Sequence, residues 1–143
     1  MKKIGEYTAK GNVAVTGTGG SSKKIQLFDG RFDTGYKVKE FIVMTNDPMF
    51  NNIEFTAKLT TRENNSRIFN WQHNDQIAWA FGEDTVWLKG IVDPENLIIE
   101  DLFIYAAINT TADVNINYLI TMEKYEISDW QGALAMATER ADP

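Results

Sequence analysis

The sequence of 143 residues contains no cysteine, only one histidine and only three prolines. The absence of cysteine excludes disulfides, thiol nucleophiles and zinc-thiolate sites. The single histidine, His73, excludes a multi-histidine metal site, and no nucleophile elbow lies near it in the sequence. We therefore expect a protein that is not an enzyme, with no catalytic residues.

Basic residues and long apolar runs are also scarce. Lysine and arginine total 14 against 20 acidic residues, so the net charge is -6, which disfavours binding to nucleic acid or to an anionic membrane surface. No segment approaches the roughly 20 apolar residues of a membrane span, and the N-terminus lacks the apolar run of a signal peptide. We expect neither membrane insertion nor export by a standard signal.

What is present is the composition of one ordered domain over residues 1–143, with 43% hydrophobic and 24% charged residues. Alternation of apolar and polar residues dominates, and it is clearest in "NIEFTAKLT". There Ile53, Phe55, Ala57 and Leu59 share one face, while Glu54, Thr56, Lys58 and Thr60 share the other. The pattern predicts a strand with one buried and one solvated face.

Similar segments, bounded by Gly, Asn, Asp or Pro, predict further strands at 12–17, 24–29, 36–45, 76–81, 85–92, 97–106 and 114–126. The short segment Gly82–Thr85 predicts a hairpin, and a shift of the apolar face predicts a bulge or a change of sheet near Lys124. These spacings favour an antiparallel β-sandwich, of which a jelly roll is one form. Residues 1–23, with the glycine-rich "VTGTGGSSKK", are expected to form a mobile N-terminal arm or a hairpin, not a phosphate-binding loop.

The C-terminal stretch changes character at Ser128, which stands three residues before Gln131 in the spacing of a capping box. Trp130, Ala133, Leu134 and Ala137 then recur at helical spacing. We predict one C-terminal α-helix over 128–141. Its narrow apolar stripe would either seal the end of its own sandwich or contact a neighbouring subunit.

Candidate ligand sites are few. Asp29 and Asp33, and Asp47 with Asn51 and Asn52, form oxygen-rich turns that share ligand chemistry with calcium loops. They lack the spacing of a calcium loop, and turns built on Asx side chains explain them without an ion. We therefore expect no cofactor and keep Ca²⁺ as the alternative.

The pair Glu100 and Asp101 stands between apolar segments, but neighbours in a strand point to opposite faces and cannot act together as glycosidase carboxylates. We expect one of them to lie near a bend, a strand crossing or a subunit contact. The tryptophans Trp71, Trp79 and Trp87 with Trp130 could form a sugar-binding platform, but aromatic residues equally build small β cores and protein interfaces, which we favour.

Three segments carry a resemblance to a family: "KKIQLFDGRFDTGYKVKEFIV", "DPENLIIEDLFIYA" and "INYLITMEKYEISDWQGALAMA". They resemble small structural proteins encoded by marine bacterial viruses, over roughly residues 24–140. The residues concerned are Gly30, Phe32, Tyr36, Asp93, Pro94, Asn96, Leu97, Asp101, Leu102, Asn117, Tyr118, Glu123, Lys124, Tyr125, Trp130 and Gly132. The resemblance implies a role in the virion and no catalytic residues.

We therefore predict a capsid-associated protein, either a minor capsid or a decoration protein, that assembles through apolar and aromatic contacts. Its partners would be copies of itself and other virion proteins such as the major capsid protein, and it would be assembled in the host bacterial cytoplasm. The predicted interface residues are Tyr125, Trp130, Leu134, Ala137, Asp101, Phe103 and Tyr105. The alternatives are a spike or fibre domain that binds host surface glycan, and a tail-tube subunit.

Overall fold

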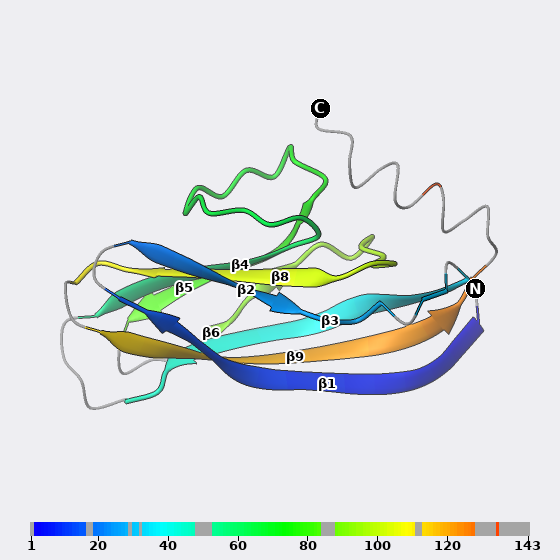
Figure 1. Ribbon diagram of the computed structural model, residues 1–143, viewed down its shortest axis with the longest axis horizontal. Coiled ribbons are helices and arrows are strands. Elements are labelled where there is room, and N and C mark those ends of the chain that lie inside the picture. Colours follow the sequence, from blue (N-terminus) through cyan, green and yellow to red (C-terminus); the bar gives the residue numbers. More distant parts are fainter. Residues whose placement is uncertain are drawn as a thin grey trace.

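The computed structural model describes residues 2–16, 19–28, 30–31, 33–47, 53–83, 88–110, 113–127 and 134. These residues form two antiparallel sheets that lie one over the other (Figure 1). The strands are β1 Lys2–Val15, β2 Gly20–Ile25, β3 Thr34–Thr45, β4 Glu54–Thr60, β5 Gln76–Glu83, β6 Leu88–Lys89, β7 Ile91–Val92, β8 Leu102–Ile108 and β9 Val114–Glu126. The sandwich-like arrangement predicted from the sequence is confirmed.

Sheet A has the strand order β1-β9-β3-β6, and sheet B has the order β2-β8-β4-β5-β7. The chain therefore crosses between the sheets after β1, β2, β3, β5, β6 and β8, and only β4 and β5 are consecutive neighbours within one sheet. Most strand pairings consequently join residues far apart in the sequence, and only the three-dimensional fold brings them together.

The core lies between the two sheets. Phe41 and Ile120 of sheet A and Phe55, Leu59 and Ile104 of sheet B are at most 1% exposed and belong to one contiguous cluster. Alternation along the central strands places alternate side chains, such as Ile116 and Ile120 of β9, in this cluster. The inner face predicted for β4, from Ile53 to Leu59, is confirmed.

Two bulges adjust the curvature of sheet A. In β1 the pairing shifts between Lys3, opposite Tyr125, and Gly5, opposite Lys124, so Ile4 is the extra residue. In β3 the pairing shifts between Val38 and Glu40. The irregularity predicted near Lys124 is therefore present, although the additional residue stands in the strand beside it.

The hairpin predicted at Gly82–Thr85 lies partly outside the described residues, which omit 84–87, but the expected pairing of Leu88 with β5 is wrong. β6 pairs with β3 in sheet A, whereas β5 pairs with β7 in sheet B. Gly90 lies where the chain passes between the sheets, since a Cβ there would stand 2.7 Å from the carbonyl oxygen of Trp79 and 3.0 Å from that of Phe41. Only glycine fits this crossing, and the crossing separates the two segments that alternation alone would pair.

Both ends of the chain differ from expectation or lie outside the described residues. The sequence predicts an arm or hairpin over residues 1–23 and strands at 12–17 and 24–29, whereas Lys2–Val15 and Gly20–Ile25 are strands of two different sheets. The strand expected at 97–106 begins only at Leu102. β1 is an edge strand and most of its residues are exposed to solvent, so its sequence shows little alternation of apolar and polar residues. The predicted helix over 128–141 lies outside the described residues except for Leu134, which is helical and 51% exposed.

Candidate interaction surface

The connection between β4 and β5, residues 61–75, extends over the outer face of sheet B (Figure 1). Its base is closed by a hydrogen bond from the Thr61 amide to the Asp75 carbonyl oxygen, at 2.8 Å. This loop covers Lys58 and Thr60 completely, since both are 0% exposed. The prediction that the second face of β4 is solvated is therefore wrong for these two residues, because a non-local segment covers it.

Lys58 anchors the loop to the sheet. Its ammonium Nζ donates to Asn64 Oδ1 at 3.2 Å and to the Ile68 carbonyl oxygen at 3.0 Å, and it lies 5.8 Å from the ring centroid of Tyr105. Burial lowers the pKa of Lys58, and the carboxylate of Asp75 opposes this shift. The charged group is thus satisfied by loop oxygens and an aromatic face, which gives the loop a defined position.

A second attachment links the loop to β5. Gln76 Oε1 accepts from the Asn70 amide at 2.8 Å and from Trp79 Nε1 at 3.0 Å. The ring of Trp79, itself only 7% exposed, lies 5.6 Å from the ring of Trp71, which is 70% exposed. The loop therefore presents one tryptophan to solvent on top of a buried one.

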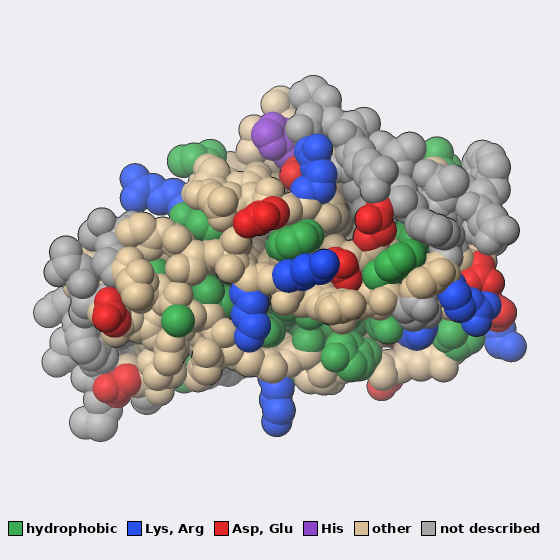
Figure 2. Space-filling view, in the orientation of Figure 1, with side chains coloured by type: hydrophobic (Ala, Val, Ile, Leu, Met, Phe, Trp, Pro, Cys, Tyr) green, Lys and Arg blue, Asp and Glu red, His purple; other side chains and the backbone are tan. Residues whose placement is uncertain are grey.

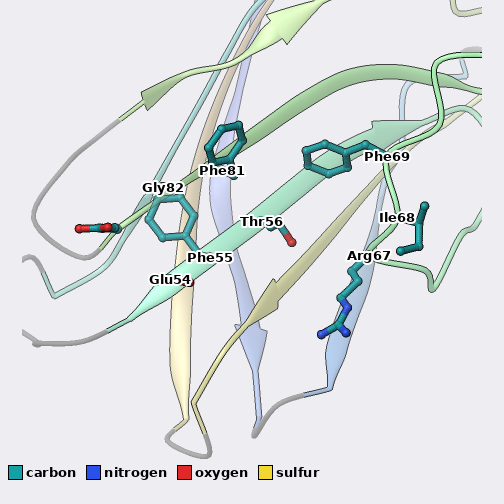
Figure 3. Close-up of a pocket in the computed structure, with 9 residues that line it drawn as sticks. Glu54, Phe55, Thr56, Arg67, Ile68, Phe69, Phe81 and Gly82 are labelled. Atoms are coloured by element: carbon teal, nitrogen blue, oxygen red, sulfur yellow. The ribbon is translucent and has the colours of Figure 1, made fainter.

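Beside the loop lies a pocket of about 540 Å³ (Figure 3). Phe81 on β5 and Phe69 on the loop lie on either side of Thr56. The lining residues are Glu54, Phe55, Thr56, Arg67, Ile68, Phe69, Phe81, Gly82 and Glu83. Charged residues therefore border a largely aromatic and aliphatic depression.

Four large apolar side chains on this side of the molecule are well exposed: Ile68, Trp71, Phe81 and Ile91, between 59 and 70%. Side chains alternate between the two faces of a strand. Phe81 points outward because its neighbour Ala80 faces the core, and Ile91 points outward because its neighbour Val92 packs against the core. We call these four residues together with the pocket the sheet B surface. Exposure of this apolar area to water costs free energy, and burial of the area against another surface removes that cost.

The outer face of sheet A has a different character. Glu123 forms ion pairs with Lys3 at 2.6 Å and with Lys39 at 3.1 Å, and Lys3 also pairs with Glu6 at 2.8 Å. The hydrogen bonds that Lys3 and then Lys39 donate to Glu123 lower its pKa to about 2, and the acceptance of hydrogen bonds by Glu123 and Glu6 raises the pKa of Lys3. On the face shown in Figure 2, acidic, basic and apolar side chains are interspersed.

The predicted interface residues that the structure describes lie on both sheets. Phe103 and the largely buried Tyr105 alternate with core residues of β8, so they face the outer side of sheet B, where their strand-pair partners are Lys24 and Lys58. Tyr125 lies on the outer face of sheet A and donates from its hydroxyl to Glu123 Oε1 at 3.0 Å. Trp130 and Ala137 lie outside the described residues, and Leu134 is exposed.

Asp101 immediately precedes β8 and lies beside the residues that follow β2, its neighbour in sheet B. Its Oδ1 accepts from the amides of Leu27 and Phe28 at 2.9 and 3.1 Å, and its Oδ2 pairs with Lys24 at 3.1 Å. Desolvation raises the pKa of Asp101, but the two amides and Lys24 outweigh it, so the pKa is lowered. Asp101 therefore fastens the end of β2 to the start of β8.

Sequence reasoning missed the importance of Lys58, Asp75 and Asn96, all of which are buried polar residues. For Lys58 the available signal was the long polar stretch after β4, which is too extended for a tight hairpin and can fold back over the sheet. Asn96 carries no comparable local signal. Its role depends on a strand 58 residues away.

The oxygen-rich turns are only partly described. Arg31 binds both carboxylate oxygens of Asp33, at 2.8 and 2.7 Å, so this candidate calcium ligand has a guanidinium partner. Asp29, Asn51 and Asn52 lie outside the described residues. Within the described part of the chain, no three His, Cys, Asp or Glu side chains gather to hold a metal ion, and no helix is long and apolar enough to cross a membrane.

No protein-family model matches the chain, and no curated protein matches it. Among solved structures, the chain is similar to one in the cryo-EM structure of Mud crab tombus-like virus, with a TM-score of 0.38 and 9% sequence identity. The similarity covers 88% of this chain and 84% of the viral one.

Proposed function

We propose that this protein is a non-enzymatic structural protein of a bacteriophage virion, attached to the capsid as a minor capsid or decoration subunit. Its location would be the virion, assembled in the host bacterial cytoplasm. The partners would be further copies of the chain and other virion proteins such as the major capsid protein. The family resemblance of the sequence agrees with this role.

The strand order supports the proposal. When β7 is set aside, the first strand pairs with the last, β2 with β8, β3 with β6, and β4 with β5. This is the order produced when one long antiparallel hairpin is rolled into two facing sheets, and we infer that the sandwich is a jelly roll. Jelly rolls occur in viral capsid proteins and in lectins, so the fold narrows the function without deciding it.

The observation that carries the proposal is the sheet B surface. A subunit that acts by assembly needs an exposed apolar area bordered by charges, and Ile68, Trp71 and Phe81 beside the charged pocket have this character. The outer face of sheet A, by contrast, already satisfies its charges through ion pairs. We therefore assign the assembly contacts to sheet B and its loop.

The second candidate is a host-recognition domain that binds surface glycan. The specific observation in its favour is Trp71, whose ring is 70% exposed and supported from below by Trp79 at 5.6 Å. Sugars stack on such exposed aromatic faces. The predicted helix over 128–141, with Trp130 at its start, stays part of the proposal as a further subunit contact.

Imaging of virions labelled with an antibody against this protein tests the proposal. Labelling distributed over the shell is expected, whereas labelling confined to the tail would refute a capsid role. Binding to a glycan array that Trp71→Ala abolishes, while the β-sheet circular dichroism spectrum is unchanged, would favour the second candidate. A Trp130→Ala protein that keeps its mass in light scattering would remove the helix from the subunit contact.

A further inference from the structure

The first half of β1 is an open edge of sheet A. Among the described strands β1 pairs with β9 alone, and in Figure 1 its N-terminal half runs along the lower border of the molecule. Its residues Glu6, Thr8 and Lys10 are all exposed. An edge strand offers a row of backbone N–H and C=O groups to another extended segment. A further strand can therefore be added to sheet A at this edge.

The hydrogen bonds of sheet A show which backbone groups of β1 point away from β9. In an antiparallel pair, alternate residues turn both backbone groups toward the partner strand, and the residues between them turn away. The Asn46 amide donates to the Asn115 carbonyl oxygen at 2.9 Å, so Asn115 faces β3 and the next residue of β9, Ile116, faces β1. Ile116 stands opposite Val13. Val13 therefore faces β9, and by alternation the even-numbered residues 6–12 turn their backbone groups outward.

Both ends of this outward-facing row are limited. Lys23 Nζ on β2 donates to the Asn12 carbonyl oxygen at 3.2 Å, which agrees with the outward direction of Asn12. At the other end the bulge at Ile4 interrupts the strand. Between these two points, no hydrogen bond from the described residues reaches the outward-facing backbone groups of residues 6–10. This segment is therefore available for pairing.

The side chains of the open segment carry one acid and one base. Lys10 forms no ion pair within the described part of the chain. Glu6, whose side chain is 75% exposed, binds Lys3 through Oε1 at 2.8 Å, and Lys3 also binds Glu123 at 2.6 Å. Lys3 is thus shared between two carboxylates and does not neutralise Glu6 by itself. The exposed Thr8 lies midway between Glu6 and Lys10.

This spacing makes the segment complementary to a second copy of itself. When two β1 strands pair antiparallel with their Thr8 residues opposite each other, Glu6 of each copy stands opposite Lys10 of the other. Opposite charges and threonine pairs are both favourable across two strands. A shift of the pairing by two residues sets both charges opposite neutral residues, and a shift by four sets Glu6 opposite Glu6 or Lys10 opposite Lys10. The charges therefore favour a second copy of the chain in this one register.

We propose that two copies of the chain join through an antiparallel β1–β1 pair centred on Thr8, which continues sheet A of one copy into sheet A of the other. On the opposite face of the pair, Tyr7, which is 46% exposed, stands across from Ala9 of the second copy. Because both copies use the same segment, the contact closes as a two-fold dimer. It rests on the proposed function as an assembling subunit and adds an edge contact to the sheet B surface.

Charge reversal tests the contact by sedimentation velocity over a range of concentrations, in which the wild type is expected to dimerise. Glu6→Lys alone and Lys10→Glu alone should each weaken dimerisation by about tenfold, because the two-fold axis makes like charges meet twice. The double variant and an equimolar mixture of the two single variants should both dimerise again, since every reversed residue then faces its complement. Glu95→Lys, in an exposed turn, is the control and should dimerise as the wild type does.

A cysteine substitution gives an independent measurement, because the chain has no cysteine of its own. Thr8→Cys would stand opposite its copy with about 5.5 Å between the Cα atoms, a separation that a disulfide spans. Mild oxidation should therefore link this variant into a dimer. Asn12→Cys is the matched control, since it is exposed on the same strand but would stand opposite Ile4 of the second copy. It should stay monomeric under the same oxidation.

Three results would each overturn the β1–β1 contact. They are a wild-type chain that stays monomeric, a double variant that dimerises no better than the single variants, and Thr8→Cys that cross-links no faster than Asn12→Cys. Shell labelling of virions together with any of these results would leave the proposed function standing while removing the contact. Cross-linking of Thr8→Cys without shell labelling would support the contact and remove the capsid role.

Discussion

Asn96 offers the most direct test of how this sandwich is stabilised. Its side chain is only 5% exposed and binds the backbone of one residue in β3: Val38 N donates to Oδ1 at 2.8 Å, and Nδ2 donates to Val38 O at 3.1 Å. A third bond runs from Nδ2 to the Asp93 carbonyl oxygen at 2.6 Å. β6 pairs with β3 only at Ile42 and Val43. At Val38, where β6 is absent, the side-chain amide of Asn96 makes the hydrogen bonds that a neighbouring strand would otherwise make.

Replacement of Asn96 by alanine leaves both backbone groups of Val38 buried without this partner. Each such group costs about 1 to 3 kcal/mol, so Asn96→Ala should lower the free energy of unfolding by about 2 to 6 kcal/mol. The total stability of a domain is about 5 to 15 kcal/mol, so the variant will be strongly destabilised. The Asp93 carbonyl oxygen still accepts a hydrogen bond from the backbone N–H of residue 96, at 3.3 Å, so it adds little to the loss of stability.

Urea unfolding followed by tryptophan fluorescence gives the measurement, with Asn12→Ala on the exposed face of β1 as the control. The control should change the free energy of unfolding by less than about 0.5 kcal/mol. If Asn96→Ala costs no more than this control, the reasoning about the β3 edge is refuted.

Asn96→Asp provides an independent check through pH. It keeps an acceptor for Val38 N but sets a carboxylate oxygen against the carbonyl oxygens of Val38 and Asp93. Repulsion and burial raise the folded-state pKa of the introduced carboxyl, so the folded state binds more protons than the unfolded state. The stability of the variant relative to the wild type should therefore be greatest below about pH 4 and fall as pH rises from there. A difference between the variant and the wild type that is the same at pH 7 as at pH 4 would contradict this.

Three further outcomes follow from contacts elsewhere in the sandwich. Hydrogen bonds from Lys3 and Lys39 lower the pKa of Glu123 to about 2, so its stabilisation is present above about pH 4.5 and is lost as pH falls toward 2. The difference in urea midpoint between the wild type and Glu123→Gln should therefore vanish on acidification, and a constant difference would contradict the ion-pair account. Burial lowers the pKa of Lys58, so the unfolded state binds more protons as pH rises toward 10.5, and the wild type should gain stability there. Lys58→Met should abolish that gain and accelerate amide exchange in residues 64–68; protection equal to the wild type would show that Lys58 does not anchor the loop. A Cβ at Gly20 would overlap the ring and hydroxyl of Tyr105, so Gly20→Ala should destabilise the fold by about 1 to 3 kcal/mol, whereas Gly19→Ala, with open space around it, should not. Equal unfolding midpoints for these two variants would rule out the close approach.

The residues behind the family resemblance acquire physical roles in the structure. Asn96 satisfies the edge of β3, and Asp101 binds two amides and Lys24 where β2 meets β8. Glu123 joins two lysines on the outer face of sheet A. These residues hold the sandwich together.

The alternation in "NIEFTAKLT" predicted the buried side of β4 correctly, yet it placed Lys58 in water. The same limit explains the missed crossing at Gly90, where two short strands separated by one residue enter different sheets. Alternation reports how a strand divides its side chains between two faces. It contains no information on which distant segment covers the second face.

The sequence by itself determined that this chain is a two-sided β protein without cysteine chemistry, because side-chain alternation and composition are local properties that hold whatever the strand order. Only the tertiary structure decided that β1 pairs with β9, that the loop at 61–75 buries Lys58, and that Glu54 and Glu83 meet beside a pocket. Each of these depends on segments distant in the chain, whose association is set by the packing of the whole core. The exposed surfaces of the molecule are therefore products of the fold.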